Sequence, residues 1–303
     1  MTLVEAHTKQ EGHESVLLHE VIEALAIRPN DTVVDGTIGG AGHFTEILHL
    51  LGEQGTLVGI DADADAVQRA RLAAKNARAS VETVQGNFRD LSRILHSSGI
   101  QTCDKILLDL GWSGYQLSSG KGFSFGADEP LLMSYGAPES VMNTGADIVN
   151  TYTERELADL IYTYGEEPKA RIIARAIVEA RSKERIISSQ ALGEIIAKAL
   201  SSHRGKRHPA TQAFQALRIA VNDEYGALRE GITASFAHLA PSGRLAVITF
   251  HSAEDRIVKQ MFRDHVAEGK GSLFSKKPIV PSYEEVRNNP RARSAKLRVF
   301  INR

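Results

Sequence analysis

The fold of this chain is decided by the stretch Thr32-Val33-Val34-Asp35-Gly36-Thr37-Ile38-Gly39-Gly40-Ala41-Gly42-His43. It opens with a short apolar run that ends in an acidic residue, and a glycine-dense turn then leads into the amphipathic segment 44–51. That order predicts a strand, a glycine-rich loop and a helix. Because glycine has no Cβ and accepts positive φ, a ligand can approach the backbone of such a loop. The free N–H groups at the start of the helix then point at that ligand.

A second predicted strand, 56–60, ends in Asp61. A carboxylate at this place accepts hydrogen bonds from both hydroxyls of a nucleotide ribose. The two strands and the loop therefore indicate half of a Rossmann-like domain that holds a nucleoside-containing cofactor. The glycine spacing differs from the dinucleotide fingerprint, and Asp35 at the head of the loop would repel a pyrophosphate but pair with an ammonium group. This favours S-adenosylmethionine over NAD, while a glycine turn without a ligand stays an alternative.

The composition is that of an ordinary globular protein. The chain has 303 residues, of which 42% are hydrophobic and 24% charged, enough for one large or two modest domains. The net charge of −1 means that any contact with nucleic acid has to come from local basic patches. Cys103 is the single cysteine, so the sequence predicts neither a disulfide framework nor a Cys-rich metal site. The polar segment 1–12 reads as a flexible tail without an apolar signal region, so we expect a cytoplasmic protein.

Further strands complete the predicted sheet, and two of them end in candidate ligand contacts. The apolar runs predict strands at 80–85, 103–110, 244–250 and 295–301. Phe88 and Asp109 follow the carboxyl ends of two of these strands, where ligands of open α/β sheets bind. Phe88 is a candidate to pack on an adenine face, although ordinary packing at a helix start explains the residue equally well.

The separation between Gly111 and Gly243 is far longer than one crossover helix requires, which predicts an insertion. Apolar spacing predicts helices at 153–164, 168–182 and 188–202 within it, and a helix at about 209–239 that returns to the sheet. We therefore expect a discontinuous sheet domain and a helical domain inserted into it. Their expected bounds are 13–134 with 213–303 for the sheet domain and 135–212 for the insertion.

Basic and aromatic side chains near the expected ligand edge are candidates for contact with nucleic acid. The basic runs are 203–208, which ends in His208, and a later group that includes Arg291 and Arg293. The residues with rings are Trp112, Tyr115, Phe125 and His251. The three aromatic residues are suited to stack on a flat base. Solvated surface for the charges, loop packing for the rings and a helix cap for His251 are the alternatives.

A series of segments matches, in order, the motifs of one known family: His13–Leu18, Asp35–His43, Leu108–Gly111, Gly122–Phe125, Tyr164–Glu167, His208–Thr211, Phe214–Glu224, Phe250–Arg256 and Asn289–Arg298. Through them the chain resembles the bacterial 16S ribosomal RNA cytosine-N4 methyltransferases of the MraW/RsmH type over about residues 13–300. The resemblance implies an α/β, class I (Rossmann-like) S-adenosylmethionine-dependent methyltransferase domain with an inserted all-helical domain. It implies methylation of a cytosine amine in 16S rRNA, at the decoding centre of the small ribosomal subunit.

The resemblance also carries site residues over by position. The cofactor contacts it implies are Ala41, Gly42, His43, Asp61, Phe88, Asp109 and Gln116. Asp109 and the backbone at 110–111 are our candidates to accept a hydrogen bond from the cytosine amine, which makes Asp109 the candidate catalytic residue. The target base has to leave its stack to reach them.

Two segments depart from the family pattern. The family usually has Ser-Ser-Pro-Gln-Leu-Asp where this chain has residues 113–118, and Asp-Gly-Pro-Leu-Asp-Met-Arg-Met-Asp where it has 128–136. Both changes fall where the base and the methyl group are expected to meet. Two alternatives to the family's reaction follow. One is cytosine-N4 methylation of another nucleic acid, and the other is a cofactor-binding RNA clamp or ribosome-assembly factor with weak or lost activity.

Overall fold

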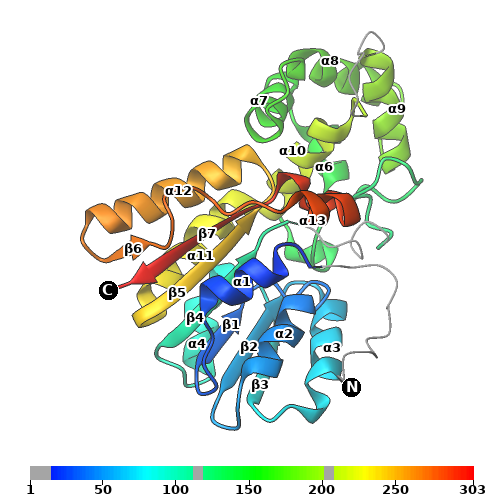
Figure 1. The fold of residues 1–303 in the computed structure, drawn as a ribbon. Helices are drawn as coiled ribbons and strands as arrows, with labels where there is room; N and C mark the ends of the chain where they lie inside the picture. The colour runs from blue at the N-terminus through cyan, green and yellow to red at the C-terminus, as the bar shows by residue number, and fades with distance from the viewer. Residues whose placement is uncertain (1–14, 112–118, 201–207) are drawn as a thin grey trace.

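A computed structural model describes residues 15–111, 119–200 and 208–303 of the chain. A seven-stranded sheet in the order β3-β2-β1-β4-β5-β7-β6 lies at its centre (Figure 1). The strands are β1 (Thr32–Asp35), β2 (Thr56–Asp61), β3 (Ser80–Gln85), β4 (Cys103–Asp109), β5 (Leu239–Thr249), β6 (Gly271–Leu273) and β7 (Lys296–Asn302). β1 to β5 pair in parallel, whereas β7 is antiparallel to both β5 and β6. This architecture confirms the predicted Rossmann-like α/β fold.

Helices cover both faces of the sheet. One apolar core includes residues of α1 (Leu18–Leu25), α2 (Gly42–Leu50) and α3 (Ala64–Ala73). A core on the other face includes residues of α4 (Leu91–Ser97), α11 (Glu224–His238) and α12 (Ser252–Ala267). Because the central strands are buried on both faces, their sequences are apolar without alternation. The parallel pairing brings the carboxyl ends of β1, β2 and β4 to one edge of the sheet.

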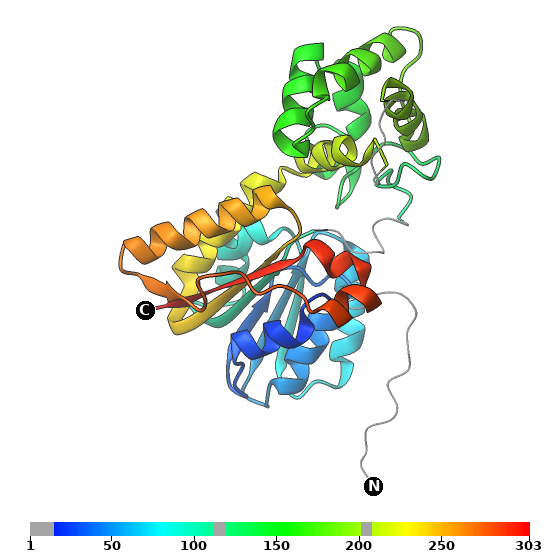
Figure 2. The same ribbon diagram turned by 45° about the horizontal axis from the view of Figure 1, so that its top comes forward.

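A second group of helices stands beyond that edge, away from the sheet (Figure 2). It consists of α6 (Gly145–Thr151), α7 (Glu154–Gly165), α8 (Ala170–Arg181), α9 (Ser189–Ala199) and α10 (Thr211–Asn222). α7 to α9 lie where the sequence predicts helices, and α6 is additional. Their shared apolar core runs from Leu131 to Val221, so it takes in α10 as well. The bounds 135–212 for a separate domain stay a prediction.

The segment predicted as one helix at 209–239 is two helices, α10 and α11, and that prediction was wrong. Asp223 separates them with φ 46° and ψ 48°, in the left-handed region, which ends the helical path. Aspartate is among the few residues that tolerate this region. Arg89 donates hydrogen bonds to the side chains of both Asp223 and Glu230, which holds the break in place.

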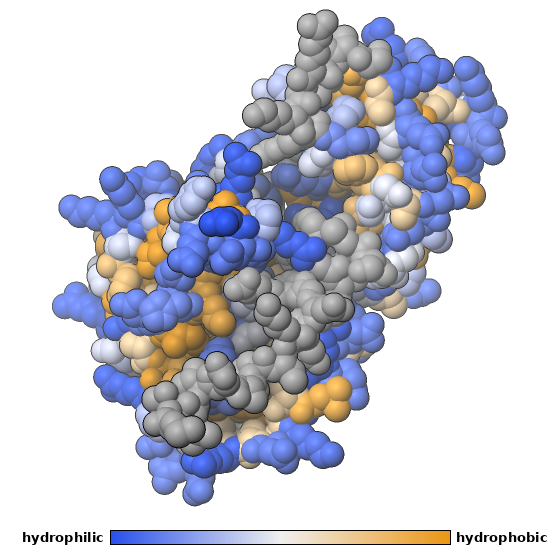
Figure 3. Space-filling model, turned by 45° about the vertical axis from the view of Figure 1, so that its right-hand side comes forward, coloured by the Kyte–Doolittle hydropathy of each residue, from blue (hydrophilic) through white to orange (hydrophobic). Residues whose placement is uncertain are grey.

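The C-terminal part adds α13 (Tyr283–Asn288) and the short turn Pro290–Ser294 before β7. α13 lies beside the N-terminal residues of the described chain, since the backbone N–H of Leu17 donates to the carboxylate of Glu285 at 2.7 Å. On one face of the molecule, apolar side chains gather on the sheet-bearing part while polar ones cover most of the rim (Figure 3). In the described ranges, no helix combines the length and apolarity that crossing a membrane demands.

Candidate cofactor and base pocket

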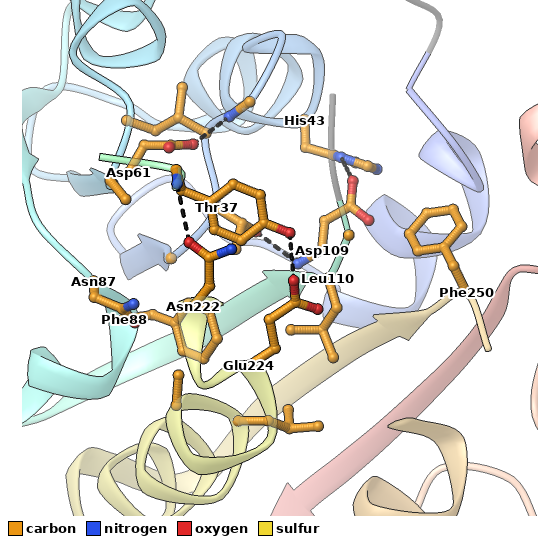
Figure 4. A pocket seen from close by; sticks show the side chains of 18 of the residues that line it. Thr37, His43, Asp61, Asn87, Phe88, Asp109, Leu110, Asn222, Glu224 and Phe250 are labelled. Atoms are coloured by element: carbon orange, nitrogen blue, oxygen red, sulfur yellow. Dashed lines mark hydrogen bonds and ion pairs between the residues drawn. The ribbon is translucent and has the colours of Figure 1, made fainter. Parts of the chain in front are cut away.

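A pocket lies at the carboxyl edge of the sheet, under the helical part. Its wall on the sheet side comes from the loop after β1, the end of β2, the turn after β3 and the end of β4: Gly36, Thr37, Ile38, Gly39, Gly40, His43, Asp61, Ala62, Gly86, Asn87, Phe88, Asp109, Leu110 and Gly111. The remaining wall comes from other parts of the chain: Ser15, Val16, Tyr135, Asn222, Glu224, Ala227, Leu228, Phe250, Glu254 and Arg291. Figure 4 shows Asp61, Asp109, Glu224 and Phe250 around the same space.

Asp61 is held by the loop that it faces. Its two carboxylate oxygens accept hydrogen bonds of 2.8 Å from the backbone N–H groups of Gly39 and Asp63. Arg69 donates to the carbonyl of Gly39, so both ends of that peptide segment are tied down. Burial raises the pKa of Asp61 although the two backbone hydrogen bonds oppose the shift. Each carboxylate oxygen keeps a lone pair for a further donor, as clamping a ribose diol requires.

Asp35 lies behind the pocket lining and is fully buried. Its Oδ1 accepts a hydrogen bond from the backbone of Thr37, while its Oδ2 has no hydrogen-bond partner among the described residues. Burial raises the pKa of Asp35 to about 7, from an ordinary value of 3.8. Asp35 is not among the residues that line the pocket. Its pairing with an ammonium group therefore stays a prediction.

Asp109 opens onto the pocket at the end of β4. Its backbone N–H donates to the hydroxyl of Thr37 at 2.6 Å, which connects β4 to the glycine-rich loop. Its Oδ2 lies 3.5 Å from Nδ1 of His43, and its Oδ1 is buried without a hydrogen-bond partner in the described part of the chain. Burial and the neighbouring charge of Asp35 raise the pKa of Asp109 well above its ordinary value.

His43 is buried at the first turn of α2, and its Nε2 lies 3.1 Å from the carbonyl oxygen of Val16. A carbonyl only accepts, so Nε2 carries hydrogen and Nδ1 faces Asp109. The ring and the carboxyl group therefore face each other at 3.5 Å. Three carboxyl groups lie in or behind one wall, and two of them have an oxygen without a hydrogen-bond partner in the ranges that the structure describes. Such an environment is suited to a cationic ligand.

The other predicted cofactor contacts differ in whether they line the pocket. Ala41 and Gly42 are not in the pocket lining: the side chain of Ala41 lies in the apolar core, and the α-carbon of Gly42 faces Ser15. Phe88 does line the pocket. A Cβ added at Gly231 would meet its ring at 2.4 Å, so Phe88 is wedged between the pocket and α11. Gln116 lies outside the described residues.

The predicted substrate contacts lie in different parts of the molecule. Arg291 lines the pocket, and Arg293 and His251 line an adjoining hollow. His251 caps the start of α12 through a reciprocal arrangement with Glu254, as the alternative reading expects. Trp112 and Tyr115 lie outside the described residues.

The ring of Phe125 is packed within the helical part. It stacks on His208 with ring centroids 4.1 Å apart and meets Phe214 edge-on at 5.5 Å. The stacked face of Phe125 is therefore occupied by His208, because both rings belong to the packing around α10. These contacts give Phe125 a role in loop packing, and its contact with a base remains a prediction.

Sequence reasoning missed a second group of lining residues, which are Tyr135, Asn222, Glu224, Phe250 and Glu254. All but Tyr135 fall inside segments that match the family motifs, so the residues themselves were visible. Their convergence was not, because Phe250 follows a strand of the sheet while Tyr135 precedes the helical part, and the two line one pocket only in the folded chain.

Comparisons of the sequence with known proteins match nearly the whole chain. The sequence pattern of the MraW methylase family matches residues 10–303. Ribosomal RNA small subunit methyltransferase H of Deinococcus radiodurans is 48% identical over 289 residues, which cover 95% of this chain and 89% of that protein. The protein of the same name from Deinococcus deserti is 48% identical over 302 residues, covering 98% and 96%. A solved rRNA methylase structure from Streptococcus thermophilus covers 94% of this chain and 93% of that chain, with a TM-score of 0.42 and 9% identity.

Proposed function

This chain belongs to the MraW methylase family and is an rRNA methyltransferase that uses S-adenosylmethionine, and we propose that it methylates N4 of a cytosine in 16S rRNA of the small ribosomal subunit. The relatives that share 48% of its residues are named for action on small-subunit ribosomal RNA. Small subunits are cytoplasmic particles, so the cytoplasm is the proposed place of action. The observation that carries the proposal is one pocket in which the ribose clamp Asp61 and the strand-end Asp109 face a separate wall.

The residues present fit the cofactor. S-adenosylmethionine supplies an electrophilic methyl group on a sulfonium, and it carries an ammonium group as well. Asp61 is proposed to hold the ribose hydroxyls, the backbone from Gly36 to Gly40 the methionine part, and Phe88 one face of the adenine. Asp35 and Asp109 each have an oxygen without a hydrogen-bond partner among the described residues, and a bound cation would favour the ionised form of both carboxyls.

The protein's work in this reaction is mostly positioning. Methyl transfer to an amine is an in-line displacement, and holding the two reactants in line supplies much of the rate. The cytosine amine is conjugated with its ring, so an acceptor beside it favours the pyramidal geometry in which the nitrogen attacks. Asp109 and the backbone at Leu110 and Gly111 are proposed as that acceptor. After transfer the nitrogen has one proton too many, and the contact between Asp109 and His43 is a place where a proton can be taken up.

The direct test uses labelled S-adenosylmethionine and small subunits from cells that lack the corresponding methylation. We expect label on N4 of one cytosine in 16S rRNA, found by nuclease mapping and nucleoside analysis. Asp109→Asn should reduce turnover by at least tenfold, and Asp159→Asn, an exposed acid on α7, should not. Label on another nucleic acid, or cofactor binding without transfer, would reject the proposal in favour of a different target or an assembly clamp.

A further inference from the structure

A buried network joins two side chains of the pocket lining, Tyr135 and Glu224, to Arg218 behind them. Oη of Tyr135 donates a hydrogen bond of 2.8 Å to Oε1 of Glu224. Arg218 donates to both carboxylate oxygens of Glu224, from Nε at 2.8 Å and from Nη2 at 3.0 Å. Only 9% of the Arg218 side chain and 12% of the Glu224 side chain are exposed. This two-point pairing is the strong geometry for arginine and carboxylate.

The network determines that Tyr135, and not Glu224, supplies the hydrogen of the bond between them. Both oxygens of the Glu224 carboxylate accept from Arg218, and Oε1 also accepts from Tyr135, so the single hydrogen of the Tyr135 phenol is committed to Glu224. Burial raises the pKa of Tyr135 well above its ordinary value of 10, and therefore the phenol keeps that hydrogen. The phenol oxygen can therefore offer any other neighbour only its lone pairs. Tyr135 is in this way an obligate acceptor toward a ligand.

The backbone around Tyr135 is held as firmly as its hydroxyl. The amide of Asn222 bridges two backbone groups: its Oδ1 accepts from N–H of Tyr135 at 2.9 Å, and its Nδ2 donates to the carbonyl of Met133 at 2.8 Å. The ring stacks on Phe123, with centroids 5.7 Å apart. A side chain fixed at both ends loses little conformational entropy when it makes one more contact.

Tyr135 and Glu224 line the same pocket as Asp109, Leu110 and Phe250. Figure 4 shows the Glu224 side chain pointing from its helix toward Leu110 and Asp109. The ribose clamp Asp61 and the glycine-rich loop belong to the sheet wall. The space between Tyr135, Phe250 and the end of β4 is therefore the part of the pocket that remains for a flat base.

We propose that Oη of Tyr135 accepts a hydrogen bond from the N4 amine of the target cytosine and thereby selects cytosine over bases that carry an oxygen at that position. The inference rests on the proposed function. An exocyclic amine has two N–H groups, so an acceptor at the end of β4 and a second one at Tyr135 together fix its orientation. A carbonyl at the same place would face the lone pairs of an oxygen that has no hydrogen to offer, which is repulsive.

Residue 135 lies in the segment where this chain departs from the family pattern. In that pattern a methionine stands at the position of Tyr135, and the arginine and later acids around it are absent here. The chain thus has a hydroxyl where the pattern has an apolar side chain. Base reading by Tyr135 is accordingly a property assigned to this chain, and not one carried over by resemblance.

The test compares Tyr135→Phe with Tyr225→Phe. Both changes remove one phenolic hydroxyl, and the Tyr225 hydroxyl is buried with no hydrogen-bond partner among the described residues. Tyr225 is also absent from the pocket lining. We expect Tyr135→Phe to lower kcat/KM for small subunits about tenfold, which corresponds to ~1.4 kcal/mol. The control should keep the wild-type value, and calorimetry should give all three proteins the same affinity for S-adenosylmethionine.

A second measurement separates base reading from a structural effect. Synthetic RNA fragments that span the target are used as inhibitors, with either cytosine or pyrimidin-2-one, which lacks the 4-amino group, at the target position. Wild type and Tyr225→Phe should bind the cytosine fragment about tenfold more tightly, and Tyr135→Phe should bind both alike. If Tyr135→Phe keeps the preference, or if its kcat/KM equals that of the control, the inference is wrong.

The failure of this inference can be told from failure of the proposed function. If wild-type enzyme transfers no methyl group to small subunits, the proposed function fails first. If wild type is active and Tyr135→Phe retains discrimination, only the role of Tyr135 fails. Should Tyr135→Phe not fold, Tyr135→Met, the residue of the family pattern, takes its place with the same expected loss of the preference for the amine.

Discussion

Oγ of Ser252 donates a hydrogen bond of 2.6 Å to Oε2 of Glu166, which joins the start of α12 to the end of α7. Arg256, one turn further along α12, lies 3.4 Å from the other oxygen of the same carboxylate. Glu166 has φ 51° at the C-cap of α7, and these contacts hold the pKa of its carboxyl below the ordinary value. The contact ties the helical part to the sheet-bearing part beside the pocket.

Glu166→Ala is expected to loosen that connection without unfolding either part. Because the ion pair is largely exposed, the change in unfolding free energy should be below about 1 kcal/mol. The KM for small subunits should rise several-fold, since the helical part would no longer be held over the pocket, while affinity for the cofactor stays the same. Steady-state kinetics and calorimetry measure the two effects. Glu184→Ala, an exposed glutamate after α8, is the control, and an equal KM in both variants would contradict the prediction.

The buried carboxyl of Asp35 should make cofactor binding depend on pH. Its pKa of about 7 means that it becomes ionised across neutral pH, and the ionised form attracts the cationic cofactor. Affinity for S-adenosylmethionine should therefore rise between about pH 6 and 8, and Asp35→Asn should flatten that rise. Calorimetric titration over this range is the measurement. Asp65→Asn, on the exposed first turn of α3, should keep the wild-type profile.

Asp35 should also make the stability of the protein depend on pH, but stability should fall with rising pH where cofactor affinity rises. The pKa of Asp35 is higher in the native protein, at about 7, than its ordinary value of 3.8. Between these values the native state binds more protons than the unfolded chain, so the unfolding free energy falls as pH rises. Without cofactor, Asp35→Asn should therefore unfold at a higher denaturant concentration than wild type at pH 8, and this advantage should be smaller at pH 5.5. A uniform loss of stability at both pH values would show that the native carboxyl is ionised throughout.

Gly231 should be needed for the position of Phe88. A Cβ at residue 231 would meet the Phe88 ring at 2.4 Å, so Gly231→Ala has to push the ring toward the pocket. We expect cofactor affinity to fall about tenfold, with destabilisation of ~1–3 kcal/mol from overpacking that the helix preference of alanine only partly offsets. Gly126→Ala is the control, since its Cβ would meet nothing closer than Ser124 Oγ at 3.5 Å. Unchanged cofactor affinity in Gly231→Ala would disprove a role for Phe88 in binding.

Asp255 should stabilise the antiparallel side of the sheet. Its carboxylate accepts hydrogen bonds from Arg298 at 2.7 Å and from Lys296 at 3.2 Å, and these partners hold its pKa below the ordinary value. A depressed pKa contributes stability that is present above pH ~4 and is lost as pH falls further. Asp255→Asn should cost about 1–3 kcal/mol at pH 7, measured by urea denaturation, and less at pH 3. An equal cost at both pH values would mean that charge is not the cause.

Much of the fold was predictable because its signals are local. The apolar runs of β1, β2, β3 and β4 and the glycine-dense turn lie within short windows of sequence, and their observed bounds differ from the predicted ones by a residue or so. The break at Asp223 was not predictable in this way. Nothing in the apolar spacing of 209–239 marks it, and the residue that holds it, Arg89, is 134 positions away along the chain.

The sequence by itself determined the chemistry at the sheet edge. Asp61 and Asp109 stand at the ends of predicted strands, and parallel pairing brings such ends to one edge of a sheet. The pattern alone therefore placed both carboxyl groups at that edge. Only the tertiary structure decided that Tyr135 bonds to Glu224 and that both line one pocket with Phe250. Those contacts depend on how the helical part packs against the sheet. Packing of this kind is set by side chains far apart in sequence, and periodicity does not encode it.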